Sequence, residues 1–351
     1  MHYIKIPIKK AESMKALLLR NALLDRKRKV MHSTRYVYFP VISIDGAKTK
    51  KLIESSYGAI IDREGSMRTE TEDYKSMLSA VLDADEMKEL TSGYDLLGNI
   101  AIIDVSDKLA GKEALIAKAI LASNKSITTV IAKAGAVSGI YRVRKFRYVS
   151  GKRTYNATYR ENGSIFVFDV RKTFFSNRLS YERSRINALV KKAEHVAVPF
   201  AGVGPFAIEI AKAHPDAKVI AIELNGDAYK AMVKNIVLNK TSNVKAYLGN
   251  VKSIAKRHAS WADRVVMPTP KTSMDFLDDA LVLAKRVSTV HIYLFCAAEG
   301  GIKKAKDAIN AHAKANSYHV RFNNVRVVRP YSKDEIEIVI DYTIRKKDQH
   351  I

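Results

Sequence analysis

The sequence predicts an α/β protein in which a doubly wound, mostly parallel sheet follows two smaller α+β domains. From about residue 165 onward, strand-like and helix-like segments alternate, which is typical of parallel strands joined by helical crossovers. Near the start of this region a strand runs through a glycine-containing turn, Phe200–Phe206, into a helix. The length of 351 residues also exceeds that of one ordinary domain.

The first segment has a strand–helix–strand pattern. Tyr3–Ile8 alternates in polarity, Lys10–Leu24 has helical spacing, and Tyr36–Val41 is a β-rich run closed by a proline. Between the last two lies a dense basic turn, Asp25–Lys29, which is either a solvated loop or a contact with RNA. We expect these elements to form a small N-terminal domain over residues 1–70.

A polar stretch, Asp62–Lys75, is predicted to link this domain to a middle α+β domain at 76–165. The middle domain is expected to open with a helix at Ser76–Leu90. Its most distinctive run is Gly139–Tyr148, where arginines and aromatic residues interleave at strand spacing. That mixture suits RNA, because cations contact phosphates and flat groups stack on bases. The alternative is an aromatic core face opposite a solvated basic face.

The third domain, at 166–351, carries the alternating pattern. We expect strands at Glu194–Phe200, Lys218–Ile222, Val244–Leu248, Ala262–Met267 and Val290–Phe295, and an antiparallel finish at Val320–Val328 and Ile336–Ile344. The helices expected between them are Pro205–Ala213, Asp227–Asn239, Met274–Lys285 and Glu299–Asn316. Together they predict a Rossmann-type sheet.

Charge and cysteine content limit the function. There are 60 Lys and Arg against 36 Asp and Glu, a net charge of +24, which favours a polyanionic partner and first of all nucleic acid. A membrane partner is not predicted, since no apolar run approaches the roughly 20 residues of a spanning helix. The single cysteine, Cys296, excludes an internal disulfide framework, and a cytoplasmic location is expected. No His or carboxylate cluster has the spacing of metal ligands.

The turn Phe200–Phe206 is the predicted cofactor site. Gly202 and Gly204 allow a tight turn close to a ligand, and Pro205 is pre-organised for the first helical position. A dehydrogenase has the same beginning, but the third glycine of a pyrophosphate cradle is absent here. Glu223, about twenty residues on, ends the next strand and can accept the hydroxyls of a ribose. A ribose without a pyrophosphate favours S-adenosylmethionine over NAD.

Two further strand ends face the same side of the predicted sheet. Asn250 follows the third strand, where it either bonds an adenine edge or is an ordinary turn residue. Pro268 and Pro270 follow the fourth strand and make a rigid loop whose carbonyls can face a ligand. We therefore include all three in the predicted cofactor site.

Several separated motifs stand in one order along essentially the whole chain. They are Tyr36–Val41, Gly139–Arg144, Phe174–Arg183, the turn Phe200–Phe206, Asp263–Met267, Phe276–Leu277 and Val328–Tyr331. In this order they resemble the archaeal and eukaryotic tRNA (guanine-37 N1)-methyltransferases, which are class I, Rossmann-fold enzymes. The resemblance implies an N-terminal domain that contacts the tRNA elbow, and a middle domain that holds the anticodon loop together with the methyltransferase domain. It implies no protein partner, and we take a monomer as the default.

The resemblance also assigns roles. Arg142 matches the arginine placed on the target guanine, and Glu182 matches the proposed general base. Cofactor contacts match Phe174, Phe200, Gly202, Pro205 and Glu223, to which we add Arg178, Gly204 and Asn225. Guanine N1 carries a proton at neutral pH, so methyl transfer needs a base, and a guanidinium can stabilise the charge that develops on O6. The alternatives are a salt bridge of Glu182 with Arg178 or Arg185, and a phosphate contact for Arg142.

The chain departs from the family pattern at two places. Val198 stands where an acid is usual, and Pro268–Pro270 stands where Asn-Leu-Pro is common. Two alternatives therefore stay open: an aminocarboxypropyl transferase of wybutosine synthesis, and a non-catalytic tRNA-binding relative.

Overall fold

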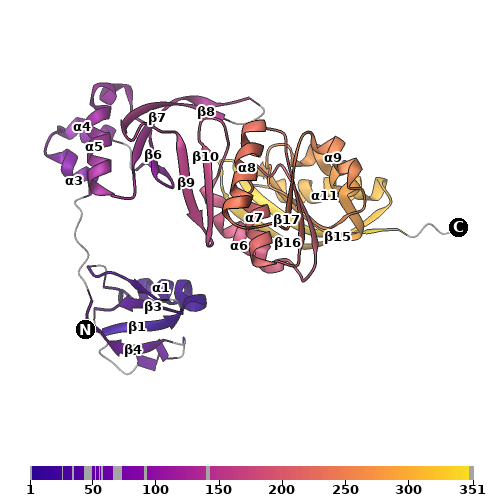
Figure 1. Cartoon of the computed structure of the whole chain (residues 1–351), viewed down its shortest axis with the longest axis horizontal. Helices are drawn as coiled ribbons and strands as arrows, with labels where there is room; N and C mark the ends of the chain where they lie inside the picture. The colour runs from indigo at the N-terminus through magenta and orange to yellow at the C-terminus, as the bar shows by residue number, and fades with distance from the viewer. Residues whose placement is uncertain are drawn as a thin grey trace. The chain divides into compact units, whose positions relative to one another are not determined.

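The structure is a computed structural model that describes residues 2–25, 27–33, 35–42, 50–51, 53–54, 56, 58–65, 73–90, 93–139 and 143–347. The chain forms two compact units, Met1–Asp73 and Tyr74–Ile351 (Figure 1).

The first unit is a small antiparallel sheet with one long helix. Its strands, in spatial order, are β2 (Met31–His32), β3 (Tyr36–Pro40), β1 (His2–Pro7) and β4 (Ala59–Asp62). The 3-10 turn Ile8–Lys10 leads into α1 (Ala11–Arg20), whose Met14 and Leu18 pack on the sheet. The predicted strand–helix–strand order is confirmed.

The predicted helix of the first unit was too long at its C-terminal end. Asn21 ends α1 and donates from Nδ2 to the Leu17 carbonyl, and Ala22 has a φ of 52°. The following Leu24 pairs with Val41 as an isolated bridge. Part of the predicted linker, Asp62–Lys75, lies outside the described residues, and Asp62 itself belongs to β4.

The second unit begins with a four-stranded sheet covered by helices. Its strands in spatial order are β5 (Asp95–Leu97), β6 (Ile100–Ile103), β7 (Thr129–Ser138) and β8 (Val143–Gly151). The 3-10 turn Asp107–Lys112 precedes α5 (Glu113–Ser123). The expected helix Ser76–Leu90 is instead two helices, α3 (Tyr74–Ser79) and α4 (Ala84–Glu89). The break occurs because Asp83 and Glu86 form a capping box that starts a new helix.

A two-stranded hairpin, β9 (Asn156–Glu161) and β10 (Ser164–Asp169), joins this sheet to the larger one. Phe166 and Phe168 share one core cluster with Ile102 of β6 and Ile208 of α7 (Pro205–Ala213). Residue 165, where we expected the middle domain to end, lies inside β10, and the three-domain division stays a prediction.

The larger sheet has seven strands in the order β13-β12-β11-β14-β15-β17-β16. The bounds are β11 (His195–Pro199), β12 (Lys218–Glu223), β13 (Val244–Leu248), β14 (Ala262–Met267), β15 (Ala284–Ala297), β16 (Tyr318–Pro330) and β17 (Glu335–Lys346). Strands β11 to β15 are parallel, and β17 and β16 add antiparallel strands. The predicted doubly wound sheet with an antiparallel finish is confirmed.

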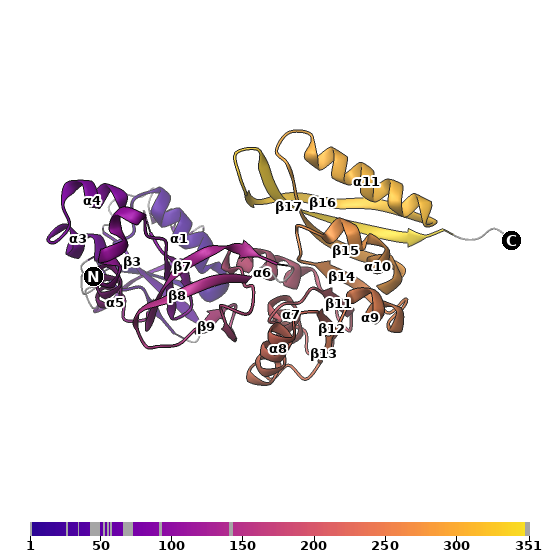
Figure 2. The ribbon, with the colours of Figure 1, turned by 90° about the horizontal axis from the view of Figure 1, so that it is seen from above.

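Helices cover both faces of this sheet (Figure 2). One face packs against α6 (Ser180–Leu189), α7 and α8 (Gly226–Leu238), and the other against α9 (Val251–Arg257), α10 (Leu277–Leu283) and α11 (Gly301–Ala315). The expected helix Met274–Lys285 is shorter, because Ser273–Phe276 is a 3-10 turn and β15 begins at Ala284. No helix in the described part of the chain is long and apolar enough to span a membrane.

Candidate active site

The turn after β11 has an unusual backbone. Phe200 and Gly202 both have a φ of 59°, and Gly204 has a φ of 92°. A bulky residue with positive φ costs about 1–3 kcal/mol and persists only where its surroundings hold it. Two contacts hold Phe200: the next residue, Ala201, donates its N–H to the Ile222 carbonyl at 2.9 Å, and the Phe200 ring lies edge-on to Phe276 with centroids 4.7 Å apart.

The two glycines of the turn serve different purposes. A Cβ on Gly202 would meet only the Phe174 carbonyl, at 3.8 Å, so the backbone there is open to a ligand. A Cβ on Gly204 would lie 2.9 Å from Cγ of Met232 and 3.0 Å from Cδ1 of Ile208. Gly204 therefore allows the turn to pack on α8, and Pro205 starts α7 at its first position. Neither Gly204 nor Pro205 lines the cavity described next.

A cavity of about 360 Å³ opens beside this turn, within the size range of small-molecule sites. Seven of the predicted cofactor residues line it: Phe174, Phe200, Gly202, Glu223, Asn225, Asn250 and Pro268. It also contains residues for which we predicted no role, namely Leu224, Ala228, Val251, Thr269, Thr272 and Phe276. Of these, Phe276 belongs to one of the motifs of the sequence analysis, and Thr269 lies between the predicted Pro268 and Pro270.

Glu223 is the anionic group of this cavity. Its Oε2 accepts the Gly202 N–H and its Oε1 accepts the Asn225 N–H, both at 2.7 Å. Burial raises the pKa of Glu223, and the backbone N–H bonds oppose that shift. Each carboxylate oxygen has a second lone pair, so both can still accept a ribose hydroxyl. The residues present therefore fit a nucleoside cofactor without a pyrophosphate.

Two asparagines that follow strands and line this cavity also cap the helices that come after them. Oδ1 of Asn225 caps α8 by accepting the Asp227 N–H at 2.9 Å, and its Nδ2 donates to the Lys172 carbonyl at 2.8 Å. Asn250 caps α9 by accepting the Lys252 N–H at 2.9 Å. For Asn250 the turn role is therefore present, and its place in the cavity leaves the adenine contact as a prediction.

A second cavity, of about 390 Å³, shares Phe174 with the first. Four of its lining residues are cations, Lys133, Arg144, Arg178 and Arg329, and its aromatic side chains are Phe146, Phe174, Phe175 and Tyr331. Arg178 thus lies in this cavity and not in the first one. Pro270 lines neither cavity, and its carbonyl accepts the Phe295 N–H at 3.1 Å.

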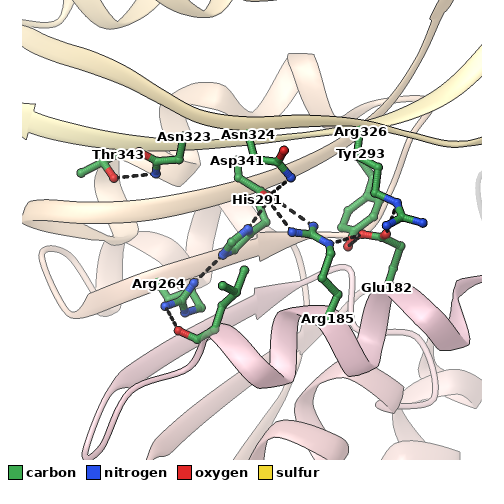
Figure 3. Close-up of polar contacts among 11 residues, drawn as sticks. Glu182, Arg185, Arg264, His291, Tyr293, Asn323, Asn324, Arg326, Asp341 and Thr343 are labelled. Carbon is green, nitrogen blue, oxygen red and sulfur yellow. Dashed lines mark hydrogen bonds and ion pairs between the residues drawn. The ribbon is translucent and has the colours of Figure 1, made fainter. Parts of the chain in front are cut away.

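Glu182 lies on α6, buried, and lines neither cavity. Its Oε2 accepts from Nε of Arg185 at 2.9 Å and from the Tyr293 hydroxyl at 3.0 Å (Figure 3). The salt bridge with Arg185, one of the alternatives for Glu182, is therefore present. Arg178 instead lies 3.7 Å from Asp95.

Arg142 and Val198 were also singled out from the sequence. Arg142 lies outside the described residues. Val198, where an acid is usual in the family, is fully buried in the core cluster that contains Phe206 and Tyr293. Within the described part of the chain, no group of three or more His, Cys, Asp or Glu residues is arranged to hold a metal ion.

The parallel sheet, the strained turn after its central strand and the acidic end of β12 define a Rossmann-type nucleotide-binding enzyme. Family models match three consecutive segments: the tRNA methyltransferase 5 N-terminal domain at residues 4–48, the TYW2 N-terminal domain at 74–154, and the TRM5/TYW2 methyltransferase domain at 157–321. The chain belongs to the TRM5/TYW2 family of S-adenosylmethionine-dependent methyltransferases, so the predicted cofactor and reaction class are confirmed.

Two relatives show how far the similarity extends along the chain. The Trm5b tRNA (guanine(37)-N(1))-methyltransferase of Pyrococcus abyssi is 29% identical over 97% of this chain and 98% of its own. The tRNA (guanine(37)-N(1))/4-demethylwyosine(37)-methyltransferase Taw22 of Nanoarchaeum equitans is 30% identical over 62% of this chain and 88% of its own.

Two solved structures bear on ligands. A complex of aTrm5 with tRNALeu superposes with a TM-score of 0.68 at 25% identity, covering 98% of this chain and 99% of that one. TYW2 of P. horikoshii in complex with MeSAdo has a TM-score of 0.68 at 25% identity, covering 78% of this chain and 98% of that one.

Proposed function

We propose that this enzyme transfers the methyl group of S-adenosylmethionine to N1 of guanine 37 in tRNA, next to the anticodon. The observation that carries the proposal is the pair of cavities that share Phe174. One has a carboxylate and an open glycine backbone for a nucleoside. The other has four cations against one acid, Asp95, and several rings, which suits a nucleotide of RNA. The Trm5b relative of Pyrococcus abyssi, which is named for this reaction, matches 97% of the chain.

The first cavity binds and orients the cofactor, which supplies an electrophilic methyl group. Glu223 accepts hydrogen bonds from the ribose, and Gly202 lets the backbone approach it closely. The rings of Phe200 and Phe276 form an apolar wall that excludes water from this side. Asn225, Asn250 and Pro268 are kept as further predicted contacts in this cavity, and Arg178 as a contact from the second cavity. Pro270, which lines neither cavity, supports the loop through the bond of its carbonyl to the Phe295 N–H.

The second cavity receives the target nucleotide, which is splayed out of its stack. Arg144, Arg178 and Arg329 neutralise phosphate charge there, and Arg142 stabilises the negative charge on O6. Glu182 takes the proton from N1 as the methyl group is transferred. Glu182 is buried outside both cavities, so the guanine must extend beyond the second cavity to reach Oε1 of Glu182. Nε of Arg326 now lies 3.2 Å from that oxygen, so Arg326 moves aside when the substrate binds.

The N-terminal unit contacts the tRNA elbow in this proposal. Its support is the family model for residues 4–48 and the net charge of +24, which suits a large polyanion. We infer a monomeric, RNA-binding enzyme that works in the cytoplasm, consistent with a single cysteine.

A second candidate is the modification of a wyosine-type base at the same position, by methyl or by aminocarboxypropyl transfer. Two observations favour it: the match of residues 74–154 to the TYW2 N-terminal domain, and the lining of the cofactor cavity by Pro268 where an asparagine is common in the methyltransferases. The match of residues 4–48 to the tRNA methyltransferase 5 N-terminal domain favours guanine methylation.

The experiment that separates the candidates identifies the modified nucleoside. The protein is incubated with tRNA and with cofactor labelled either in the methyl group or in the aminocarboxypropyl chain, and the tRNA is digested to nucleosides. We expect methyl label in N1-methylguanosine. Methyl label in a tricyclic nucleoside alone, or transfer of the aminocarboxypropyl label, would contradict the proposal.

A further inference from the structure

A network of largely buried polar side chains extends from Glu182 to Arg264, whose Nη2 donates to the Leu189 carbonyl at the C-terminal end of α6 (Figure 3). Behind Glu182, the guanidinium of Arg185 binds Asp341 of β17 with two bonds, Nη1 to Oδ2 at 2.6 Å and Nη2 to Oδ1 at 3.2 Å. Nδ1 of His291 lies 2.6 Å from Oδ1 of the same Asp341. The sequence separations are 156 and 50 residues, so the fold assembles these contacts.

The chain of contacts ends on another ion pair. Nη1 of Arg264 lies 2.5 Å from Nε2 of His291, and the same guanidinium donates to both carboxylate oxygens of Glu194, at 3.0 and 3.1 Å. With Arg326 included, three guanidiniums balance the carboxylates of Glu182, Asp341 and Glu194. Removing one charged group from such a balanced set leaves its partner without a counter-charge and destabilises the folded protein.

The pKa shifts of His291 and Asp341 indicate which group donates and which accepts at each hydrogen bond of this network. Burial lowers the pKa of His291, and the neighbouring Arg264 lowers it further, whereas Asp341 opposes the shift. A neutral imidazole can then donate from Nδ1 to Asp341 and accept at Nε2 from Arg264. Burial alone would raise the pKa of Asp341, but its bonds to His291 and Arg185 hold that pKa well below its usual range. The lowered pKa favours the anionic form of Asp341, and its two bonds orient Arg185.

The two oxygens of Glu182 are in different situations. Oε2 receives two donors, Nε of Arg185 and the Tyr293 hydroxyl. Oε1 is buried and, among the described residues, has no hydrogen-bond partner, although Nε of Arg326 is 3.2 Å away. Arg326 is the partly exposed member of the set, with its guanidinium carbon 4.2 Å from the ring centroid of the exposed Tyr181.

We propose that Tyr293 and the pair Asp341–Arg185 are positioning residues for Glu182: they hold Oε2 and leave Oε1 as the atom that accepts the proton from the substrate. The inference rests on the proposed base role of Glu182. The groups that face this carboxylate are Arg185 on its own helix, Tyr293 on β15 and Arg326 on β16, with Asp341 behind Arg185. Hydrogen bonds to Oε2 fix the orientation of the carboxylate, so Oε1 has a defined position and these donors do not occupy it.

The test is a double-mutant cycle on the full-length protein. Single-turnover methyl transfer to tRNA is measured at saturating cofactor and tRNA for wild type, Tyr293→Phe, Glu182→Gln and the double variant. We expect Tyr293→Phe alone to slow transfer about tenfold, as the loss of one hydrogen bond to a charged group allows. In the Glu182→Gln background the same change should cost less than about twofold, because the group to be positioned is already altered.

Controls separate positioning from folding. Tyr342→Phe removes a hydroxyl from another buried tyrosine of the same sheet, in the opposite core cluster, and should leave the rate unchanged. Cofactor affinity, measured by calorimetry, should change less than twofold in Tyr293→Phe. Asp341→Asn repeats the cycle for the Arg185 side and is used if its melting curve shows a folded protein.

The outcomes are distinguishable. An equal slowing by Tyr293→Phe in both backgrounds, or no slowing in wild type, would overturn the positioning role while leaving the base role intact. Full activity of Glu182→Gln, or a collapse of its cofactor affinity, would instead contradict the base role on which the inference rests.

Discussion

At the scale of single residues, Glu223 combines two tasks. It holds the turn by accepting the Gly202 and Asn225 N–H groups, and it presents the remaining lone pairs to the cavity. A carboxylate in this position both shapes the site and binds the ligand. Its substitution should therefore weaken cofactor binding more than tRNA binding.

We predict that Glu223→Gln weakens the binding of S-adenosylmethionine about tenfold or more, because an amide provides only one accepting atom for the two N–H groups and the ribose. Titration calorimetry measures the affinity. Asp227→Asn, at an exposed acid nearby in α8, is the matched control. Unchanged affinity in Glu223→Gln would show that the ribose is bound elsewhere.

A second carboxyl, Glu209 of α7, should make stability depend on pH. Burial raises its pKa to about 8, helped by the neighbouring Glu161, while the bond from Asn162 and the charge of Arg183 oppose the shift. Folding therefore favours the protonated form, and the stability of the folded state falls as pH rises from about 5 to about 8.

We predict that Glu209→Gln, which keeps an amide in place of the protonated acid, removes this loss. Relative to wild type, its free energy of unfolding in urea should be higher at pH 8 than at pH 5 by about 2 kcal/mol or more. Glu299→Gln, at an exposed position, should show no such difference. Parallel pH curves for Glu209→Gln and wild type would contradict the prediction.

The sequence predicted the site residues that lie next to one another along the chain. Gly202, Phe200 and Glu223 were found because a turn and the following strand end have a characteristic spacing. Tyr293 and Asp341 could not be found, because they contact α6 from strands more than a hundred residues away, and His291 bonds to Asp341 and Arg264. Nothing in local periodicity marks such a partner.

At the scale of elements, asparagine side chains of α8 and of its C-cap accept hydrogen bonds from the backbone of β10. The Val167 N–H donates to Oδ1 of Asn235 at 2.8 Å, and the Ile165 N–H donates to Oδ1 of Asn239 at 2.9 Å. Nδ2 of Asn235 also donates to the carbonyl of Val203, in the cofactor turn, at 3.1 Å. Asn235 thus ties the hairpin to the cofactor turn, and Asn239, the C-cap residue of α8, adds a second bond to the hairpin, which the alternating strand–helix pattern did not reveal.

We predict that Asn235→Ala lowers the free energy of unfolding by about 2–4 kcal/mol, because it removes the partners of the half-buried Val167 N–H and of the buried Val203 carbonyl. It should also weaken cofactor binding through the turn. Urea unfolding checks the first effect, with Asn316→Ala, at the exposed end of α11, as the control. A change no larger than that of the control would mean that water replaces the amide.

Element boundaries were predicted best where a local signal ends the element. Helix α7 and strands β13 and β14 have the expected bounds, since proline, glycine or a loop follows each pattern directly. The helix expected at Ser76–Leu90 was broken by a capping box, which local periodicity does not distinguish from a continuing helix.

At the scale of the whole molecule, the two compact units have separate cores. The first unit buries Ile4, Ile6 and Phe39 in a cluster of its own. The net charge of +24 supplies the long-range attraction to tRNA, which should weaken steeply with salt.

We predict that a protein starting at Tyr74 folds and still modifies a short anticodon stem-loop at nearly the full rate, but binds whole tRNA about tenfold more weakly, because its elbow contacts are gone. Filter binding and single-turnover rates on both RNAs test this. Equal losses on stem-loop and whole tRNA would argue against a separate elbow-binding unit.

The central claim is that the methyl group goes to N1 of the guanine that follows the anticodon. The most direct measurement compares transfer of labelled methyl to two transcripts that differ only at position 37, one with guanine and one with adenine. The account predicts N1-methylguanosine from the first transcript and no label in the second. Equal labelling of both transcripts would contradict it.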